Sequence, residues 1–209
     1  MRKLRPLPLF IFILLQLIVF VLTKLLTEQK CFETNVFYLI SIFLLINVLV
    51  YRIILFLIPI PEGDLKEGSR AETIWMINLC FWLTYFHPLK NINIIPVYLS
   101  PFTNRLFGGK MSLQSFSAGL LFDPHLIVIR EGSFVGNRAL LVPHYQEGRK
   151  FGHKKITIGK NVTIGANSVV LSGVVIEDNA IVGAMSLVTK NSIIKTGEVW
   201  AGVPAVKIK

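Results

Sequence analysis

Charged residues are scarce in this chain of 209 residues, since Asp, Glu, Lys and Arg together make up 16% of it. Hydrophobic residues make up 53%. This composition excludes an intrinsically disordered chain, which has too few apolar residues to form a core. Acidic residues are the rarer of the two signs, 12 against 22 basic ones, and the net charge is +10. Such an excess is typical of proteins that bind nucleic acid, an acidic substrate or an anionic membrane surface.

Cysteine is almost absent from the chain. The two cysteines, Cys31 and Cys80, form neither a metal-ligand motif nor a disulfide framework. Polar residues are also too few for an ordinary soluble domain, because the mean hydropathy is +0.61. The location of the apolar residues therefore decides the class of protein.

Two long runs with almost no charge lie near the N-terminus. Residues 7–23 contain no charged residue, and residues 36–60 contain one, Arg52. A membrane-spanning helix needs roughly 20 apolar residues, so we predict a two-helix transmembrane anchor over residues 1–60. A signal peptide is the alternative for the first run. Against it, no cleavage site of small residues follows that run, and a second apolar run comes soon after.

Basic residues in the short flanks predict the orientation of these helices. Three of them precede the first run: Arg2, Lys3 and Arg5. In the connecting loop two lysines are matched by two glutamates, and Arg52 lies toward the end of the second run. We therefore expect both termini in the cytoplasm, the loop around Cys31 outside, and the protein in the inner (cytoplasmic) membrane. A basic cytoplasmic part beside anionic lipid fits this arrangement.

Residues 61–107 form a connector. Pro-Glu-Gly-Asp at 61–64 ends the second helix, and Ser69 with Glu72 three residues later forms a capping box. The 14 residues 73–86 carry no charge and are rich in Trp and Tyr. They are short for a span, and such side chains favour the headgroup region, so we predict an interfacial or partly buried helix. A third crossing is the alternative, and irregular chain is expected from Pro88 to Pro101.

A six-residue repeat fills the C-terminal half. Every sixth position from residue 158 is aliphatic and β-branched: Ile158, Ile164, Val170, Ile176, Val182, Val188 and Ile194. The same phase reaches back to Ile129. A period of six is the signature of a parallel β-helix. A chance series of sandwich strands would show a period of two without this longer one.

Short strands separated by tight turns then form a triangular prism with three hexapeptides per coil. The aliphatic side chain points inward and stacks on its equivalent in the next coil, about 4.8 Å away. We therefore predict a β-helix domain over residues 108–209, after the transmembrane anchor and the connector.

The sequence of residues 156–191, with Val-Trp-Ala-Gly-Val-Pro-Ala at 199–205, resembles the left-handed β-helix acyltransferases of the hexapeptide-repeat family. Weaker matches upstream are PEG at 61–63, LFGGKM at 106–111 and DPHLIVI at 123–129. They resemble a membrane-bound branch related to the C-terminal region of polylysine-synthetase-like enzymes. The expected fold class is two N-terminal transmembrane α-helices and an interfacial helix, followed by a left-handed parallel β-helix.

This resemblance also implies a reaction. The family transfers an acyl group from a pantetheine thioester, usually acetyl-CoA, to a hydroxyl or amine. Its members are homotrimers, and each active site lies between two neighbouring prisms. We therefore expect acetyl-CoA or another acyl-CoA as co-substrate and no metal.

The base of such a reaction should be a histidine, because a neutral imidazole accepts a proton near pH 7. The repeat breaks once, between Leu141 and Ile158, which are 17 residues apart where 18 would keep the register. His144 lies at the start of this polar interruption, and it matches a histidine of the sugar acetyltransferases that the chain resembles. We therefore predict His144 as the general base, with Glu147 as the candidate that orients it.

Two further histidines are secondary candidates. His125 lies in a context similar to that of a histidine in the serine acetyltransferases, but a structural role in a turn is the interpretation we favour. His153 ends the polar interruption, where it is a candidate contact for pantetheine or substrate.

The resemblance also implies which residues contact the acyl-CoA. Two alanines occupy positions at which family members offer backbone groups to pantetheine, a Thr-Lys pair matches residues near the nucleotide phosphates, and two lysines lie near the family's terminal basic residue. In this order they are Ala166, Ala184, Thr189, Lys190, Lys207 and Lys209. A phosphate-bearing donor and anionic lipid account for the positive charge, so we expect no nucleic acid partner.

Three kinds of function fit the sequence. The first is a membrane-bound acyltransferase that acts at the cytoplasmic face on an envelope glycan, a lipid-linked sugar or another amphiphilic acceptor. The second is an amide-forming transferase with a carrier-protein thioester as donor. The third is a non-catalytic trimeric membrane scaffold or a γ-type carbonic anhydrase. The zinc site of that enzyme type needs a histidine pair five residues apart, whereas His144 and His153 are nine apart.

Overall fold

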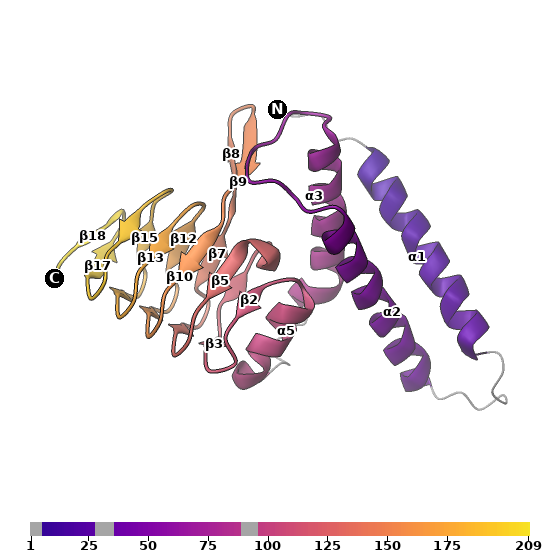
Figure 1. Cartoon of the computed structure of the whole chain (residues 1–209), viewed down its shortest axis with the longest axis horizontal. Coiled ribbons are helices and arrows are strands. Elements are labelled where there is room, and N and C mark those ends of the chain that lie inside the picture. The colour runs from indigo at the N-terminus through magenta and orange to yellow at the C-terminus, as the bar shows by residue number, and fades with distance from the viewer. Residues whose placement is uncertain (1–5, 28–35, 89–95) are drawn as a thin grey trace.

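The computed structural model describes residues 6–27, 36–88 and 96–209. It consists of a helical part, formed by the N-terminal half of the chain, and a β-prism formed by the C-terminal half (Figure 1). The first coil of the prism lies beside the helices, and the C-terminus lies at the far end (Figure 1).

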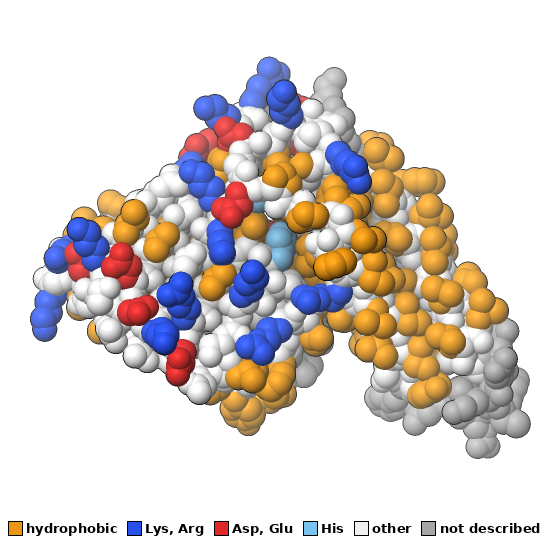
Figure 2. Space-filling view, viewed as in Figure 1, with side chains coloured by type: hydrophobic (Ala, Val, Ile, Leu, Met, Phe, Trp, Pro, Cys, Tyr) orange, Lys and Arg blue, Asp and Glu red, His pale blue; other side chains and the backbone are white. Residues whose placement is uncertain are grey.

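The helical part begins with two long apolar helices, α1 (Pro6–Thr27) and α2 (Val36–Leu57). Both are long and apolar enough to cross a membrane. A core helix of a soluble protein would be mostly buried, whereas only 17% and 11% of the residues in their apolar windows are buried. Hydrophobic side chains cover this side of the molecule (Figure 2). An exposed apolar surface of this extent is typical of a membrane or partner contact.

The residues that predict the orientation lie outside the described part of the chain. They are Arg2, Lys3, Arg5 and the loop residues 28–35, which include Cys31. The orientation across a membrane therefore stays a prediction. Arg52 is described, and its Nη1 donates a hydrogen bond to the carbonyl oxygen of Arg105 at 3.0 Å, which joins α2 to the connector.

Helix α3 (Arg70–Phe81) begins at the expected capping box. The Ser69 hydroxyl oxygen accepts a hydrogen bond from the Glu72 backbone N–H at 3.2 Å. The helix continues into a π-helical turn, η1 (Trp82–Phe86). It packs against the apolar helices, since the Phe81 ring meets the Phe12 ring edge-on with centroids 5.1 Å apart. The helix is therefore largely buried.

The two tryptophans of this segment do not reach a headgroup region. Trp75 and Trp82 are 7% and 2% exposed. Their indole N–H groups donate to Asp123 Oδ1 and to the Leu121 carbonyl oxygen, each at 3.2 Å. The expectation that these side chains favour the membrane surface is wrong, because they fill the interface between α3 and the first coil of the prism.

The connector is more regular than the sequence predicts. After residues 89–95, which lie outside the described part, a 3-10 turn η2 (Val97–Leu99) leads into α5 (Ser100–Leu106). The Ser100 hydroxyl oxygen accepts a hydrogen bond from the Ser117 backbone N–H at 2.9 Å. The expectation of irregular chain is therefore wrong for this stretch, because α5 is bound to the first coil.

The prism contains three parallel sheets, as the six-residue repeat predicts. The first sheet is formed by β2 (Lys110–Met111), β5 (Ile127–Ile129), β10 (Ile156–Ile158), β13 (Val175–Ile176) and β16 (Ile193–Ile194). The second is formed by β3 (Phe116–Ser117), β6 (Phe134–Val135), β11 (Thr163–Ile164), β14 (Ile181–Val182) and β17 (Val199–Gly202), with β18 (Ala205–Lys207) antiparallel at its end. The third is formed by β4 (Leu120–Leu121), β7 (Leu140–Val142), β12 (Val169–Leu171) and β15 (Leu187–Val188).

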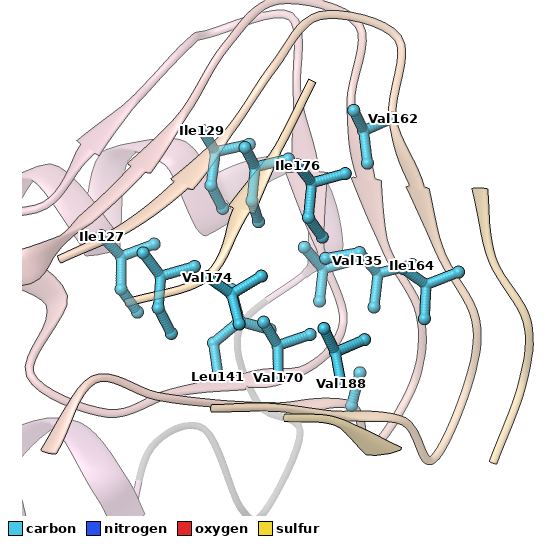
Figure 3. Packing of buried hydrophobic residues seen from close by; sticks show 14 of the residues in the cluster. Ile127, Ile129, Val135, Leu141, Val162, Ile164, Val170, Val174, Ile176 and Val188 are labelled. Atoms are coloured by element: carbon cyan, nitrogen blue, oxygen red, sulfur yellow. The ribbon is translucent and has the colours of Figure 1, made fainter. Parts of the chain in front are cut away.

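Aliphatic side chains fill the prism in rows. The strand register aligns Ile129, Ile158, Ile176 and Ile194 in successive coils. All four are 2% exposed or less. Figure 3 shows such side chains gathered in the interior between the sheets. β-Branched residues suit these positions because they pack well on a pleated surface, and the predicted core of the repeat is confirmed.

The turns between the strands show a second period of six. Residues with positive φ recur at every sixth position on either side of the break in the repeat: Gly132, Arg138, Asn161, Asn167, Gly173, Asn179, Met185, Asn191 and Gly197. Glycine and asparagine adopt this left-handed conformation more easily than other residues. Their recurrence at the corners is an independent signal of the fold that the aliphatic pattern does not contain.

The break in the repeat is an inserted hairpin. Ile129 pairs with Ile158, 29 positions later, whereas Ile164 pairs with Val182, 18 positions later, so this coil contains 11 extra residues. A shortfall of one residue is therefore the wrong reading. The insert folds into β8 (His144–Glu147) and β9 (Lys150–His153), and β1 (Gly63–Asp64), the strand after α2, pairs with β9.

Candidate active site

His144 is the first residue of β8, where the chain leaves the prism. Its Nδ1 atom lies 2.5 Å from Oδ2 of Asp123, which precedes the short helix η3 (Pro124–Leu126) between the first and second coils. The Asp123 side chain is 3% exposed and the His144 side chain is 25% exposed. A buried carboxylate therefore holds one ring nitrogen of a histidine that solvent reaches.

The backbone of Asp123 has a left-handed conformation, with φ 44° and ψ 62°. Asp is one of the few residue types enriched in this region. Pro124 disfavours the right-handed helical conformation for the residue before it, which makes the alternative less accessible. The local sequence thus produces a sharp turn that places the carboxylate beside His144.

The second carboxylate oxygen of Asp123 also has a donor. The Trp75 indole Nε1–H donates to Oδ1 at 3.2 Å, while Oδ2 faces His144. Helix α3, which lies far from the prism in the sequence, therefore supplies one group of the site.

Aromatic rings enclose the imidazole of His144. The rings of Trp75 and Phe122 meet it edge-on, at centroid distances of 5.8 and 5.7 Å. Phe151 on β9 packs on Trp75 at a centroid distance of 4.4 Å. Among the described residues, Asp123 is the one hydrogen-bond partner of the imidazole, through Nδ1. The Nε2 atom is therefore the one that can face a substrate.

His125 lies in η3, and its two ring nitrogens are buried without a hydrogen-bond partner among the residues described. This burial lowers the pKa of His125 to about 4, although the nearby Asp123 carboxylate acts in the opposite direction. The ring is therefore neutral at pH 7, and neither nitrogen is accessible to an acceptor. This geometry favours the structural role over the catalytic one.

His153 pairs with His144 across the hairpin and is 0% exposed. Burial lowers the pKa of His153, and the Asp123 carboxylate opposes this effect. The contact of His153 with pantetheine or substrate stays a prediction, and the absence of exposed surface on the residue disfavours it. Its position fits the packing of the hairpin against β1.

The carboxylate that contacts His144 is Asp123, and the carboxylate of Glu147 contacts Lys190 instead. The Lys190 Nζ lies 2.5 Å from Glu147 Oε1 and 4.3 Å from the ring centroid of Tyr145. The assignment of Glu147 as the group that orients His144 is therefore wrong, because the β8 side chains at these two positions point to different partners. Lys190 joins the hairpin to a later coil.

The predicted donor contacts lie at separate places on the prism. Ala166 and Ala184 occupy the same corner of successive coils, where the Met185 backbone N–H donates to the Ala166 carbonyl oxygen at 2.9 Å. Their small side chains leave the coil edge low. A flexible ligand arm can therefore approach the backbone along this edge.

The four remaining donor candidates are divided between two coils. Thr189 and Lys190 follow β15 and lie near the hairpin of His144. Lys207 and Lys209 lie at the last coil, where Lys207 Nζ forms an ion pair with Glu198 at 2.9 Å. The structure thus places Lys190 close to the His144 hairpin and leaves the two C-terminal lysines at the far end.

Metal-ligating side chains do not converge in the part of the chain that the structure describes. No group of three or more His, Cys, Asp or Glu side chains over residues 6–27, 36–88 and 96–209 is placed to hold a metal ion. What these residues do form is an imidazole paired with a carboxylate.

Sequence analysis does not identify two residues of this site, Asp123 and Trp75. The Asp-Pro-His sequence at 123–125 contains a signal for the first, because an acidic residue before proline marks a turn. No comparable signal exists for Trp75, whose contact with Asp123 crosses 48 residues of sequence. Tertiary packing of α3 on the first coil determines that contact.

Comparison with known proteins gives a family and several relatives. The family described as bacterial transferase hexapeptide (six repeats) matches residues 155–190. Galactoside O-acetyltransferase from Escherichia coli (strain K12) is 34% identical over 121 residues, which are 54% of this chain and 58% of that protein.

Two relatives of other kinds share shorter or more divergent stretches. Delta-poly-L-ornithine synthetase from Acinetobacter baumannii (strain AB307-0294) is 28% identical over 141 residues, 60% of this chain and 10% of that protein. Gamma carbonic anhydrase 2, mitochondrial, from Arabidopsis thaliana is 41% identical over 58 residues, 26% of this chain and 21% of that protein. The chain thus spans somewhat more than half the length of the galactoside enzyme and much less of these two.

Proposed function

The chain belongs to the hexapeptide-repeat transferase family through its prism, and we propose that it is an acyltransferase. The proposed reaction moves an acyl group, with acetyl as the first candidate, from acyl-coenzyme A to a hydroxyl or amine. The observation that carries this proposal is the 2.5 Å contact between His144 Nδ1 and Asp123 Oδ2 at the point where the hairpin leaves the prism.

In the proposed mechanism His144 is the general base. With Nδ1–H donating to Asp123, Nε2 carries the lone pair that accepts the proton of the acceptor hydroxyl or amine. The acceptor atom forms a bond to the thioester carbonyl carbon, the carbon–sulfur bond breaks, and His144 returns the proton to the departing thiolate. The Asp123 carboxylate stabilises the imidazolium that exists between these steps.

The donor is proposed to lie along the coil edges with its phosphates near lysines. The low edge at Ala166 and Ala184 supports a place for the pantetheine arm, and the side chain of Lys190, 28% exposed, supports a phosphate contact near the hairpin. The proposed set of donor contacts is Ala166, Ala184, Thr189, Lys190, Lys207 and Lys209.

We further propose that α1 and α2 anchor the enzyme in the inner membrane, with both termini and the prism in the cytoplasm. The apolar surface of these helices supports this location. An anchored site acts on an acceptor that is itself at the membrane, so the proposed acceptor is an envelope glycan, a lipid-linked sugar or another amphiphile. A homotrimer, in which a neighbouring prism completes each site, is the proposed assembly.

A second candidate function follows from one comparison. The similarity to delta-poly-L-ornithine synthetase covers 60% of this chain, which is more than the galactoside enzyme covers. In this alternative the donor is a carrier-protein thioester and the product is an amide. The role of His144 is the same, so the two candidates differ only in the donor and the acceptor.

The test uses the full chain in detergent with acetyl-CoA as the donor. Release of free thiol is measured against a panel of acceptors, namely a simple galactoside, an amino sugar nucleotide and a membrane lipid extract, and products are identified by mass spectrometry. We expect one acceptor class to gain the mass of an acetyl group, and His144→Ala to abolish this transfer. Glu147→Gln is the matched control on the same strand.

Two results would contradict the proposal. Full transfer by His144→Ala would remove the base assignment while leaving the acyltransferase class intact. Transfer from an acyl carrier protein thioester, with none from acetyl-CoA, would favour the amide-forming candidate.

A further inference from the structure

The Asp123 carboxylate has two nitrogen donors that come from different parts of the chain. Oδ2 lies 2.5 Å from His144 Nδ1 at the start of the hairpin, and Oδ1 lies 3.2 Å from Trp75 Nε1 in helix α3. The side chain of Asp123 is 3% exposed, so solvent reaches little of either oxygen. A buried ionised carboxylate is stable only when hydrogen bonds compensate its charge, and the indole N–H supplies one of the two bonds here.

Packing holds the Trp75 indole in this place. Its ring lies 4.4 Å from Phe151 on β9 and belongs to a buried cluster with Ile74 and Leu65. The same indole meets the His144 ring edge-on at 5.8 Å. One side chain therefore contacts the carboxylate, the imidazole and the second strand of the hairpin.

From this geometry we propose that Trp75 is a positioning residue for His144, which it reaches through Asp123. This inference rests on the proposed function of His144 as the base. The indole N–H fixes the plane of the carboxylate, so that Oδ2 faces Nδ1 and the imidazole presents Nε2 to the acceptor. Helix α3 is thereby part of the active site, in addition to joining the apolar helices to the prism.

The same helix provides a matched control. Trp82 also donates its indole N–H to the first coil at 3.2 Å, but its acceptor is the backbone carbonyl oxygen of Leu121. It is 2% exposed, compared with 7% for Trp75. Loss of either N–H removes one buried hydrogen bond between α3 and the prism, and only the loss at Trp75 affects Asp123.

The experiment replaces each indole, one at a time, by benzothienylalanine, which keeps the size and shape of tryptophan and lacks the N–H donor. For transfer from acetyl-CoA, we expect the substitution at Trp75 to lower kcat by about 10- to 100-fold, the range for a hydrogen bond to a charged group, with KM for acetyl-CoA unchanged. The acid side of the pH–rate profile should move to higher pH, because the carboxylate loses a donor that favours its ionised form. The substitution at Trp82 should leave both quantities as in the wild type.

A readout that does not depend on activity separates this inference from the proposed function. The proton shared by His144 and Asp123 should give a downfield Nδ1–H signal in NMR spectra of histidine-labelled protein, identified by its loss in His144→Gln. We expect this signal to be lost or displaced with the analogue at Trp75 and retained with the analogue at Trp82. An unchanged signal and unchanged kcat at Trp75 would overturn the positioning role. A displaced signal in a protein with no acyl transfer would preserve the positioning and refute the function.

Discussion

Lys190 and Glu147 join the inserted hairpin to a later coil of the prism. The ammonium nitrogen lies 2.5 Å from Glu147 Oε1, across 43 residues of sequence, and 4.3 Å from the ring centroid of Tyr145. The Lys190 side chain is 28% exposed, so part of it is accessible to a ligand. A lysine in this position can serve either the hairpin or a phosphate of the donor, and mutagenesis distinguishes the two.

We predict that Lys190→Met raises KM for acetyl-CoA about tenfold with little change in kcat, because a charge-assisted contact to phosphate is lost. Steady-state kinetics with acetyl-CoA as the varied substrate measure this. Glu147→Gln tests the alternative: it should reproduce the defect if Lys190 acts only by holding the hairpin, and should not if Lys190 binds the donor. Lys160→Met, at an exposed ion pair with Glu131, is the control for loss of one positive charge.

Asp123→Asn should lower kcat by about 10²- to 10⁴-fold, the usual contribution of a positioned general base. An amide in place of the carboxylate can present its NH₂ group to Nδ1, which favours the wrong imidazole tautomer and stabilises imidazolium less. The double variant with His144→Ala should be no slower than His144→Ala alone, because the two side chains act as a unit. Additive losses would show that Asp123 acts independently of His144.

The buried imidazole of His125 predicts loss of stability in acid. Its pKa of about 4 in the folded chain lies below its usual value of 6.5, so the unfolded chain binds the proton more readily between these pH values. The stability is fully present above about pH 6.5 and is lost as the pH falls toward 4, by about 2 kcal/mol at pH 5. His153, whose pKa burial also lowers, contributes in the same direction.

Thermal unfolding at pH 7 and pH 5 measures this effect. His125→Asn should be less stable than the wild type at pH 7 and should lose less stability on acidification. An identical pH dependence in the variant and the wild type would show that other groups are responsible.

Met185 occupies a corner position at which most other coils have asparagine or glycine. Its φ is 57° and its side chain is 72% exposed. Met185→Asn should stabilise the chain by about 1 kcal/mol, because asparagine tolerates the left-handed conformation better than methionine. The reverse change, Asn179→Met, should destabilise it by a similar amount, and both effects are measured as shifts in Tm. A lower Tm for Met185→Asn would indicate that methionine makes a contact which outweighs the backbone strain.

The loop around Cys31 provides a test of the orientation. An impermeant thiol reagent added to intact cells should label Cys31 if this loop lies outside the cytoplasm, as the flanking charges predict. Cys31→Ser controls for labelling of Cys80, which is half-buried on α3. Labelling that requires broken cells would reverse the orientation.

The sequence predicts the prism well because its core depends on a local rule. Each aliphatic residue at the sixth position fills the same place in the next coil, so Ile158, Ile176 and Ile194 can be aligned without knowledge of the structure. The length of the hairpin is not accessible in the same way. A gap of 17 residues reads as a coil that lacks one residue, and only the pairing of Ile129 with Ile158 shows that it contains 11 extra ones.

The site is less predictable for the same physical reason. The position of His144 follows from the break in the repeat, but its partner depends on where the turn at Asp123 directs a carboxylate. Glu147 is closer in sequence, and a β-strand directs its side chain elsewhere. Trp75 reaches the site only because α3 packs on the first coil, and no local pattern encodes such a contact.

The short strand β1 has a consequence for the order in which the molecule assembles. Gly63 pairs with His153 and Asp64 with Gly152, so the sheet that contains His144 closes a loop of about 90 residues. Contacts so distant in sequence form late in folding, and we expect the coils on both sides of the insert to form before this sheet is complete. A prism produced without the helical half would leave the edge of β9 unpaired, and such an edge readily adds a strand from another chain.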